Sequence, residues 1–223
     1  MTFEERAARL TAMDDCERLI SKHCYYHSMG WRREEFDRLW SKRNDITLSL
    51  NSGKLCSRAS IYKSYVLDQE QESFDYHMQV RMIYPQIDDR VKDFRTMLRY
   101  RKPLSSNMVI EVAEDGKSAK GLWYAMGYEM NTLNLTKKIQ ARWLMQRYGA
   151  DFIFEDGEWK ILNLSIFSDA EGRFDEYQWP INKTESCMEK VNLDTREDLH
   201  MTHSKFQLPQ ATPAIPQPYK TLD

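Results

Sequence analysis

The sequence is short of several features that define common classes of protein. Its 223 residues include only 4 cysteines, 8 glycines and 7 prolines. No two cysteines form a C-x-x-C pair, so the usual zinc-ribbon and thioredoxin-like motifs are not supported. No run of about 18 apolar residues is present, and we therefore expect no membrane-spanning segment. The 32 basic and 34 acidic residues nearly cancel, so the chain lacks the basic excess that nucleic acids and membrane surfaces attract.

The N-terminus also lacks the features of an export signal. The opening stretch MTFEERAARLTAMDD is charged and has no long apolar segment, which argues against secretion. We therefore expect a cytoplasmic protein without nucleic-acid or membrane partners. Hydrophobic residues make up 41% of the chain, which is enough for a sizeable core in one domain with appendages.

Helical spacing dominates the first half of the chain. Residues 3–28 and 32–42 place their apolar residues at intervals of three and four, which predicts two helices. Residues 57–72 show the same spacing. The segment 73–103 is rich in arginine and aromatic residues and is interrupted by Pro85, and we interpret it as one or two further helices.

Strand-like alternation dominates the second half. Residues 45–57 predict a hairpin that turns at an Asn-Ser-Gly sequence. From Asn107 onward, four strands joined mostly by glycine turns predict an antiparallel meander, with a bulge at Gly149. Their sequences are NMVIEV, SAKGLWYAMGYEM, KKIQARWLMQRYGADFIF and WKILNLSIF.

This order of elements predicts an α+β fold. Helices gathered on one face of a curved antiparallel sheet would form a cone, capped by the N-terminal helices, with a pocket at its open end. We assign this cone domain to residues 1–170. Residues 171–223 turn polar, and residues 187–223 carry four prolines, so we expect an extended tail that is disordered or that packs on its own domain or on a partner.

Three segments carry a resemblance to a known family. They are YYHSMGWRREEFDRLWSKRNDI (Tyr25–Ile46), IEVAEDGKSAKGLWY (Ile110–Tyr124) and YGADFIFEDGEWKILNL (Tyr148–Leu164). In this order and spacing, over residues 5–170, the chain resembles the SnoaL-like branch of the nuclear transport factor two-like superfamily. That family folds as a cone with a deep cavity, but it contains dehydratases, isomerases, cyclases and proteins that only bind.

The resemblance implies acid–base chemistry without a metal or an organic cofactor. Dehydratase-like members carry a pocket tyrosine near the end of the first helix, and Tyr26 matches it best. His27 beside it could act as a base near neutral pH. The carboxylate that follows in those enzymes is missing here, because the matching stretch Met29–Arg33 contains none. Tyr26 and His27 could equally be core aromatics under the sheet.

Two further histidines are candidate chemical groups. His77 is a third catalytic candidate, which would have to reach the pocket from a neighbouring helix; otherwise it faces solvent. His23 and His27 are separated by one helical turn and could share a metal ion, but no third ligand motif accompanies them. We therefore predict catalytic roles for Tyr26, His27 and His77, and no metal.

Aromatic and polar residues of the strands are candidates for substrate binding. Asn163 and Ser165 are predicted to share a face with Trp159, Ile161 and Phe167, and a buried polar pair must find hydrogen-bond partners. Those partners would be a ligand, water or groups within the sheet. The full predicted binding set is Tyr25, Trp31, Trp123, Tyr124, Arg142, Trp143, Asn163, Ser165 and Phe167.

The sequence thus favours a cofactor-independent lyase, of the dehydratase type, or an isomerase. Its substrate would be a hydrophobic, hydroxylated aromatic or polycyclic small molecule. The alternatives are a non-catalytic protein that binds such a molecule and a pure dimerisation module. We also expect a homodimer or higher homo-oligomer formed by the outer face of the sheet, with the tail packed on a neighbour.

Overall fold

A computed structural model describes residues 2–83, 85, 99–133, 138–174, 191–200 and 211–222. For residues 99–107, 131–133 and 138–140 it describes the backbone alone. Within these residues the chain forms helices on one face of a seven-stranded sheet. The predicted α+β class is confirmed.

The N-terminal helices begin and turn as their sequences predict. Helix α1 (Phe3–Ser28) starts at Thr2, whose hydroxyl accepts from the Glu5 backbone while the Glu5 carboxylate accepts from the Thr2 backbone. This reciprocal capping box satisfies two donors at the helix start. Helix α2 (Arg32–Leu39) follows after a short turn and ends slightly earlier than predicted.

A hairpin and a long helical stretch come next. Strands β1 (Thr47–Leu50) and β2 (Gly53–Leu55) pair antiparallel, as predicted. Helix α3 (Arg58–Ile61) continues into the π-helical turn η1 (Tyr62–Leu67) and then into α4 (Asp68–Ile83), which ends just before Pro85. The helical prediction for 73–103 is confirmed as far as Ile83 and is wrong for residues 99–103, which begin the strand β3; residues 84 and 86–98 lie outside the described residues.

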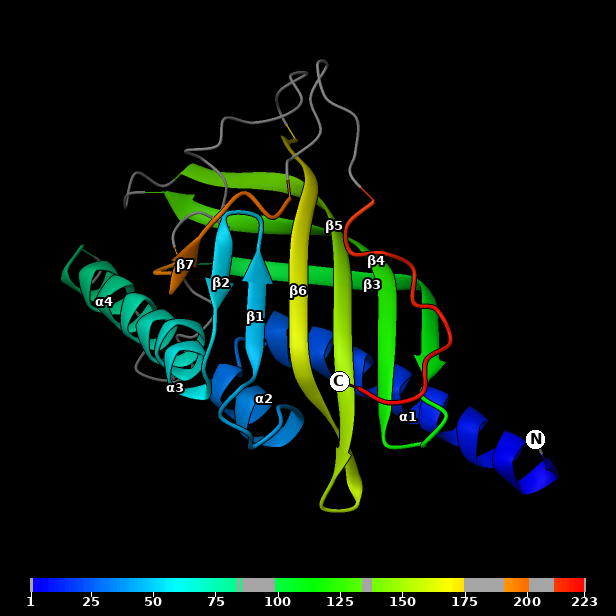
Figure 1. The fold of residues 1–223 in the computed structure, drawn as a ribbon. Helices are drawn as coiled ribbons and strands as arrows, with labels where there is room; N and C mark the ends of the chain where they lie inside the picture. Colours follow the sequence, from blue (N-terminus) through cyan, green and yellow to red (C-terminus); the bar gives the residue numbers. More distant parts are fainter. Residues whose placement is uncertain are drawn as a thin grey trace.

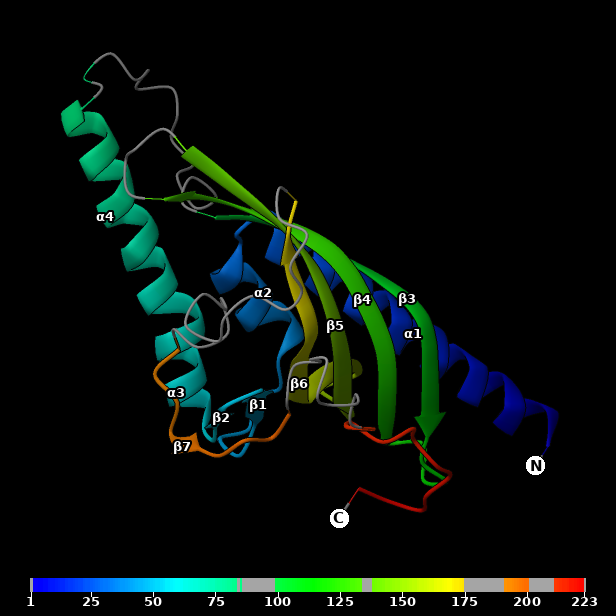
Figure 2. The same ribbon diagram turned by 90° about the horizontal axis from the view of Figure 1, so that it is seen from above.

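Four long strands form most of the sheet. They are β3 (Arg99–Val112), β4 (Ser118–Leu133), β5 (Lys138–Glu155) and β6 (Glu158–Arg173). With the short β7 (Thr195–Arg196), the order is β3-β4-β5-β6-β1-β2-β7. All pairs are antiparallel except β1 with β6. The strands bend along their length, and α1 and α2 cover one face, here called the inner face (Figures 1 and 2).

Strand β3 begins earlier in the chain than the sequence suggests. Alternation predicts a first strand from Asn107, whereas β3 pairs with β4 from Arg99 onward. Proline at position 103 obscures this, because proline weakens a strand pattern. Strand β6 likewise continues to Arg173, beyond the predicted end of the cone domain at residue 170.

A β-bulge in β6 reverses which residues face the helices. Phe152 pairs with Ile161, but the next residue back, Asp151, pairs with Asn163, so Leu162 is an extra residue. One extra residue shifts the two-residue alternation by one position. Ile161 therefore faces the core and Asn163 the outer face. The prediction that they share a face is wrong.

The second irregularity in this pair of strands lies near the other end of β6. Met145 pairs with Ala170 and Gln146 with Ser168, which leaves Asp169 as the extra residue. The bulge predicted at Gly149 is absent, since Gly149 pairs regularly with its neighbours in β4 and β6.

The C-terminal segments cover part of the outer face. The 191–200 segment adds β7 to β2 at the edge of the sheet. The 211–222 segment crosses the outer face, where Glu114 and Asp115 donate backbone hydrogen bonds to the carbonyls of Tyr219 and Lys220 (Figure 1). This part of the tail therefore packs on its own domain, which is one of the arrangements expected from the sequence.

Candidate functional site

Two buried side chains from the N-terminal helices form the centre of the candidate site. His23 lies on the buried side of α1, and Glu35 lies beside Phe36 on the buried side of α2. Gly30, with φ 68°, allows the chain to reverse between the two helices. His23 Nδ1 lies 2.7 Å from Glu35 Oε1, and both side chains are 0% exposed. Because a carboxylate only accepts, His23 Nδ1 donates in this contact, which leaves Nε2 as the second polar atom of the ring.

A tyrosine from η1 holds the other side of the carboxylate. The Tyr65 hydroxyl donates to Glu35, at 2.8 Å from Oε1 and 3.0 Å from Oε2. Burial, and then the nearby charge of Glu35, raise the pKa of Tyr65 well above its ordinary value of 10. Tyr65 therefore stays protonated and acts as a donor at neutral pH.

An arginine and a second histidine complete the network. The Arg32 guanidinium lies 4.6 Å from the centre of the Tyr65 ring and contacts both ring nitrogens of His27. His27 Nδ1 also lies 2.9 Å from the Tyr65 hydroxyl. The Arg32 guanidinium therefore places a positive charge beside Tyr65 and His27.

Two polar atoms at the sheet side of this network have no hydrogen-bond partner among the described residues. They are Nε2 of His23 and the indole Nε1 of Trp123, and both residues are 0% exposed. The two rings contact the same ring of Tyr148, with centroid distances of 6.0 Å for His23 and 5.5 Å for Trp123. A proton acceptor and a hydrogen-bond donor thus flank one aromatic side chain. The acceptor has a carboxylate behind it, which is an arrangement that acid–base catalysis can use.

A second polar cluster occupies the same inner face farther along β5. Arg142 lies 3.7 Å from Glu129 and 3.5 Å from Glu171, and all three are nearly fully buried. Ser168 donates to Glu171 at 2.9 Å. Arg147, on the same strand, lies on the opposite, outer face, where it pairs with Asp169.

Comparison with known proteins decides the family. A family model described as a SnoaL-like domain matches residues 8–165. The chain belongs to the SnoaL-like family. The predicted family is therefore confirmed.

Solved structures agree with this SnoaL-like assignment at the level of the fold. A provisionally named scytalone dehydratase from Novosphingobium aromaticivorans matches with a TM-score of 0.52 and 15% identity, covering 80% of this chain and 98% of that chain. LinA matches with a TM-score of 0.50 and 11% identity, covering 80% and 99%. Comparison with curated protein sequences gives no match. At these identities the likenesses establish the fold alone.

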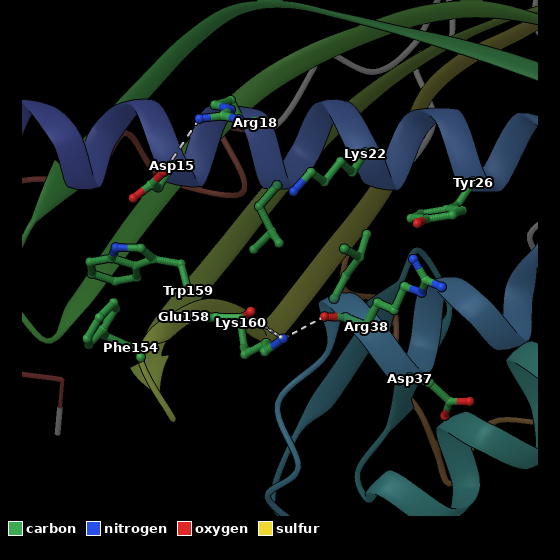
Figure 3. Close-up of a pocket in the computed structure, with 13 residues that line it drawn as sticks. Asp15, Arg18, Lys22, Tyr26, Asp37, Arg38, Phe154, Glu158, Trp159 and Lys160 are labelled. Atoms are coloured by element: carbon green, nitrogen blue, oxygen red, sulfur yellow. Dashed lines mark hydrogen bonds and ion pairs between the residues drawn. The ribbon is translucent and has the colours of Figure 1, made fainter.

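The SnoaL-like cone places the predicted catalytic residues in three different regions. His27 is buried and belongs to the network around Glu35. Tyr26, one residue earlier, points into a surface groove on the other side of α1 (Figure 3). His77 lies on α4 and is only 7% exposed, so the alternative that it faces solvent is wrong. The catalytic roles of all three stay predictions.

The predicted aromatic binding residues are similarly divided. Trp123 lies on the inner face, whereas Tyr124 and Trp143 lie on the outer face with exposures of 52% and 39%. Tyr25 and Trp31 pack edge to face, with ring centroids 5.9 Å apart, beside the surface groove on α1. Only part of the predicted set is therefore brought together.

The polar pair of β6 lies on the outer face. Asn163 accepts hydrogen bonds from the backbone and hydroxyl of Thr47 and donates to Asp151 at 2.9 Å. Ser165 pairs with Gly149 on the face that the 211–222 segment covers. These contacts match the alternative of hydrogen bonds within the sheet. Phe167 stacks on His200, with ring centroids 5.1 Å apart.

The sequence analysis did not identify Glu35, although the family resemblance implies a carboxylate in the pocket. Glu35 sits in the charged stretch RREEFDRLW, where a glutamate normally faces water. Its position directly before Phe36 and four residues before Leu39 was the available signal, because it places Glu35 at the edge of the apolar side of α2. The sequence suggested His23 only as a metal ligand. Among the described residues, no group of three or more His, Cys, Asp or Glu side chains could hold a metal ion.

Proposed function

We propose that this SnoaL-like protein is a cofactor-independent lyase or isomerase in which His23 is the catalytic base. The observation that carries the proposal is the unpartnered Nε2 of His23, which is backed by Glu35 and contacts the same Tyr148 ring as Trp123, whose N–H is also unpartnered in the described structure. Imidazole is the side chain best suited to accept a proton near pH 7. The paired carboxylate holds the ring in one tautomer and stabilises the imidazolium that forms.

The proposed substrate is a hydrophobic, hydroxylated aromatic or polycyclic molecule that carries a carbonyl group. The rings of Trp123 and Tyr148, stacked at 5.5 Å, support a flat substrate, because aromatic side chains favour stacking with one another and with similar ligands. The core around these rings is apolar and includes Trp40 and Phe152, which supports a substrate with little charge.

The chemistry follows from the two flanking groups. His23 Nε2 takes a proton from the carbon next to the carbonyl, while the Trp123 N–H donates a hydrogen bond to the oxygen that gains negative charge. In a dehydration, the electron pair then expels the β-hydroxyl group, and the imidazolium returns its proton so that water leaves. In an isomerisation, the imidazolium returns the proton to a different carbon. Each step uses only groups of the chain and substrate.

Proton exchange at carbon provides the most direct test. The protein is incubated in D2O with a series of hydroxylated aromatic and polycyclic ketones, and deuterium incorporation and product formation are followed by NMR and mass spectrometry. We expect His23→Gln to slow both by about 10²- to 10⁴-fold. The matched control is His200→Gln, a histidine that also pairs with a carboxylate but lies on the outer face. Equal rates in the two variants would refute the assignment of His23.

A non-catalytic binding protein is the second candidate. The complete burial of His23, Glu35 and Trp123 favours it, because a catalytic base must be reached by substrate. A compound that raises the melting temperature, is recovered unchanged and shows no deuterium uptake would select this candidate.

The proposal includes a cytoplasmic homodimer. The outer face carries four large apolar side chains that are each 39–54% exposed, on neighbouring strands β4 and β5: Tyr124, Met126, Trp143 and Met145. Exposed apolar residues gathered on one surface support an interaction between subunits. Sedimentation analysis should give a dimer mass that Trp143→Ser lowers, and a monomer in the unmodified protein would contradict this part. No helix in the described part of the chain is long and apolar enough to cross a membrane.

A further inference from the structure

A surface groove lies on the side of α1 that faces away from the His23 network. Its volume is about 760 Å³, and it runs between α1, α2 and the turn that joins β5 to β6 (Figure 3). Helix α1 lines it with Leu19, Lys22 and Tyr26, whereas His23 and His27 belong to the buried network. The groove is therefore separate from the proposed catalytic site. Its volume falls within the range of about 300–1,000 Å³ that is typical of small-molecule sites.

Two cations in this groove have no ion-pair partner within 4 Å among the described residues. Lys22 from α1 and Arg38 from α2 extend into the space between the two helices (Figure 3). Lys22 acts on Glu158 only at longer range: the pKa of that carboxyl is lowered mainly by its hydrogen bond with Lys160, and Lys22 adds a smaller effect.

The other two cations that line the groove are already engaged. Lys160 donates to the carboxylate of Glu158 and to the Arg38 carbonyl, at 2.7 Å each. Arg18 lies 3.8 Å from Asp14 and 4.0 Å from Asp15. The remaining acid, Asp37, acts on Arg33, whose pKa is raised first by Glu70 and further by Asp37. The lining thus holds four bases against three acids, and Lys22 and Arg38 are the two bases without an ion-pair partner within 4 Å among the described residues.

Aromatic rings lie on both sides of these two cations. Phe154 and Trp159 meet edge to face, with centroids 5.5 Å apart, at the end formed by the β5–β6 turn. Tyr26 lies at the other end, where a second hollow of about 360 Å³ begins; Lys22 and Tyr26 line both hollows. Lysine and arginine bind carboxylate, sulfonate and phosphate groups, and aromatic side chains stack on flat rings.

We propose that this groove is a second binding site, for a small aromatic anion. Lys22 and Arg38 would bind its carboxylate, sulfonate or phosphate group, and its ring would lie against Trp159 or Tyr26. The inference goes beyond the proposed function, because it uses none of the residues around His23.

Binding of 2-naphthoate, compared with neutral 2-naphthamide, tests the charge requirement. Isothermal titration at low salt should show 2-naphthoate binding at least about tenfold more tightly, and added salt should weaken it. Equal affinity for the two compounds would overturn the proposal.

Paired variants locate the site. Lys22→Ala/Arg38→Ala should weaken 2-naphthoate binding by about tenfold or more. Arg6→Ala/Lys117→Ala removes the same charge from two exposed positions outside the groove and should not alter binding. Circular dichroism confirms that both variants fold. If the two pairs bind alike, the groove is not the site.

One further variant separates this result from the proposed function. Trp123→Phe changes the inner face of the sheet and leaves the groove intact. If Trp123→Phe abolished 2-naphthoate binding while the groove variant retained it, the ligand would occupy the cone interior, and the proposal would be overturned. Loss of carbon-proton exchange in His23→Gln with unchanged 2-naphthoate binding is the result expected if both proposals hold.

Discussion

The two faces of the sheet each carry a histidine paired with a carboxylate, and the two pairs differ in their surroundings. On the inner face, His23 Nδ1 lies 2.7 Å from Glu35; on the outer face, His200 Nε2 lies 2.8 Å from Asp169. Both histidines are almost fully buried, and in each ring the other nitrogen has no partner among the described residues. The pair geometry alone therefore does not distinguish a catalytic group from a structural one.

The two pairs differ first in the other side chain that donates a hydrogen bond to the carboxylate. Glu35 accepts from the neutral hydroxyl of Tyr65, whereas Asp169 accepts two hydrogen bonds from the Arg147 guanidinium, at 2.8 and 3.0 Å. Burial opposes ionisation of Asp169, but the hydrogen bonds from His200 and Arg147 outweigh it and lower the pKa of Asp169 below its ordinary value. The Arg147 guanidinium thus stabilises Asp169 as an anion.

The two pairs differ also in the rings that lie beside each histidine. His23 shares the ring of Tyr148 with Trp123, whose N–H has no partner in the described structure. His200 instead stacks flat on Phe167, which offers no donor or acceptor. Proton transfer needs a second polar group near the base, so the inner pair suits catalysis, and the outer pair suits attachment of the 191–200 segment to the sheet.

Removal of the inner carboxylate should give the largest effect. Glu35→Gln keeps the shape of the side chain but removes the charge that stabilises the His23 imidazolium. We expect proton exchange at carbon to slow by about 10²-fold or more, measured by NMR in D2O. Glu17→Gln, at an exposed position on α1, is the control. Full activity in Glu35→Gln would show that the inner pair is as structural as the outer one.

Removal of the outer carboxylate should lower stability and leave exchange at carbon unchanged. Asp169→Asn should cost roughly 1–3 kcal/mol at pH 7, since Arg147 and His200 lose a charged acceptor. Because the folded pKa of Asp169 is lowered, its stabilisation is complete above the unfolded value of 3.8 and is lost as the pH falls through the folded pKa.

The difference in unfolding free energy between Asp169→Asn and the unmodified protein should therefore shrink below pH 3.8. Urea denaturation at pH 7 and at acidic pH measures it. Asp156→Asn, a mostly exposed carboxylate paired with Lys42, should show a smaller cost. A constant difference over the whole pH range would contradict the assigned role of Asp169.

Crowding the outer face should loosen its covering segment. Gly149 lies directly under this segment, because a Cβ there would lie 2.6 Å from Cγ of Pro213. Gly149→Ala should cost about 1–2 kcal/mol and speed amide exchange at the segment-bonded donors Glu114 and Asp115. Unchanged exchange at both amides would show that the 211–222 segment does not pack there in solution.

The smallest effect is expected from Tyr65→Phe. This change removes one hydrogen bond to Glu35 and should cost about 1 kcal/mol at neutral pH. The pKa of Tyr65 is raised in the folded protein. Its contribution to the unfolding free energy is therefore complete below pH 10 and is lost above that value, as the tyrosine of the unfolded chain ionises. The unfolding free energies measured at pH 7 and above pH 10 should therefore differ less for Tyr65→Phe than for the unmodified chain.

Local patterns were sufficient to predict most of the elements. The spacing of apolar residues in 3–28 and the glycine turns between strands are properties of neighbouring residues, and each produced the expected element. They also carried the motifs of the SnoaL-like family, which the match over residues 8–165 confirmed.

The positions of the β-bulges could not be predicted in the same way. The stretch ILNLSIF alternates without a sign that Leu162 is an extra residue, because a bulge depends on how two strands pair across the sheet. Because of that one residue, Asn163 and Ser165, which were predicted to bind the substrate, lie on the outer face.

The sequence by itself determined the α+β class, the family and which ionisable side chains are present. Only the tertiary structure decided which of them meet: it joined His23 to Glu35, separated Tyr26 from His27, and placed Trp123 and Tyr124 on opposite faces. The reason is physical. Propensity and periodicity act over a few residues, whereas a buried pair from two helices forms only when their apolar sides pack against a common sheet.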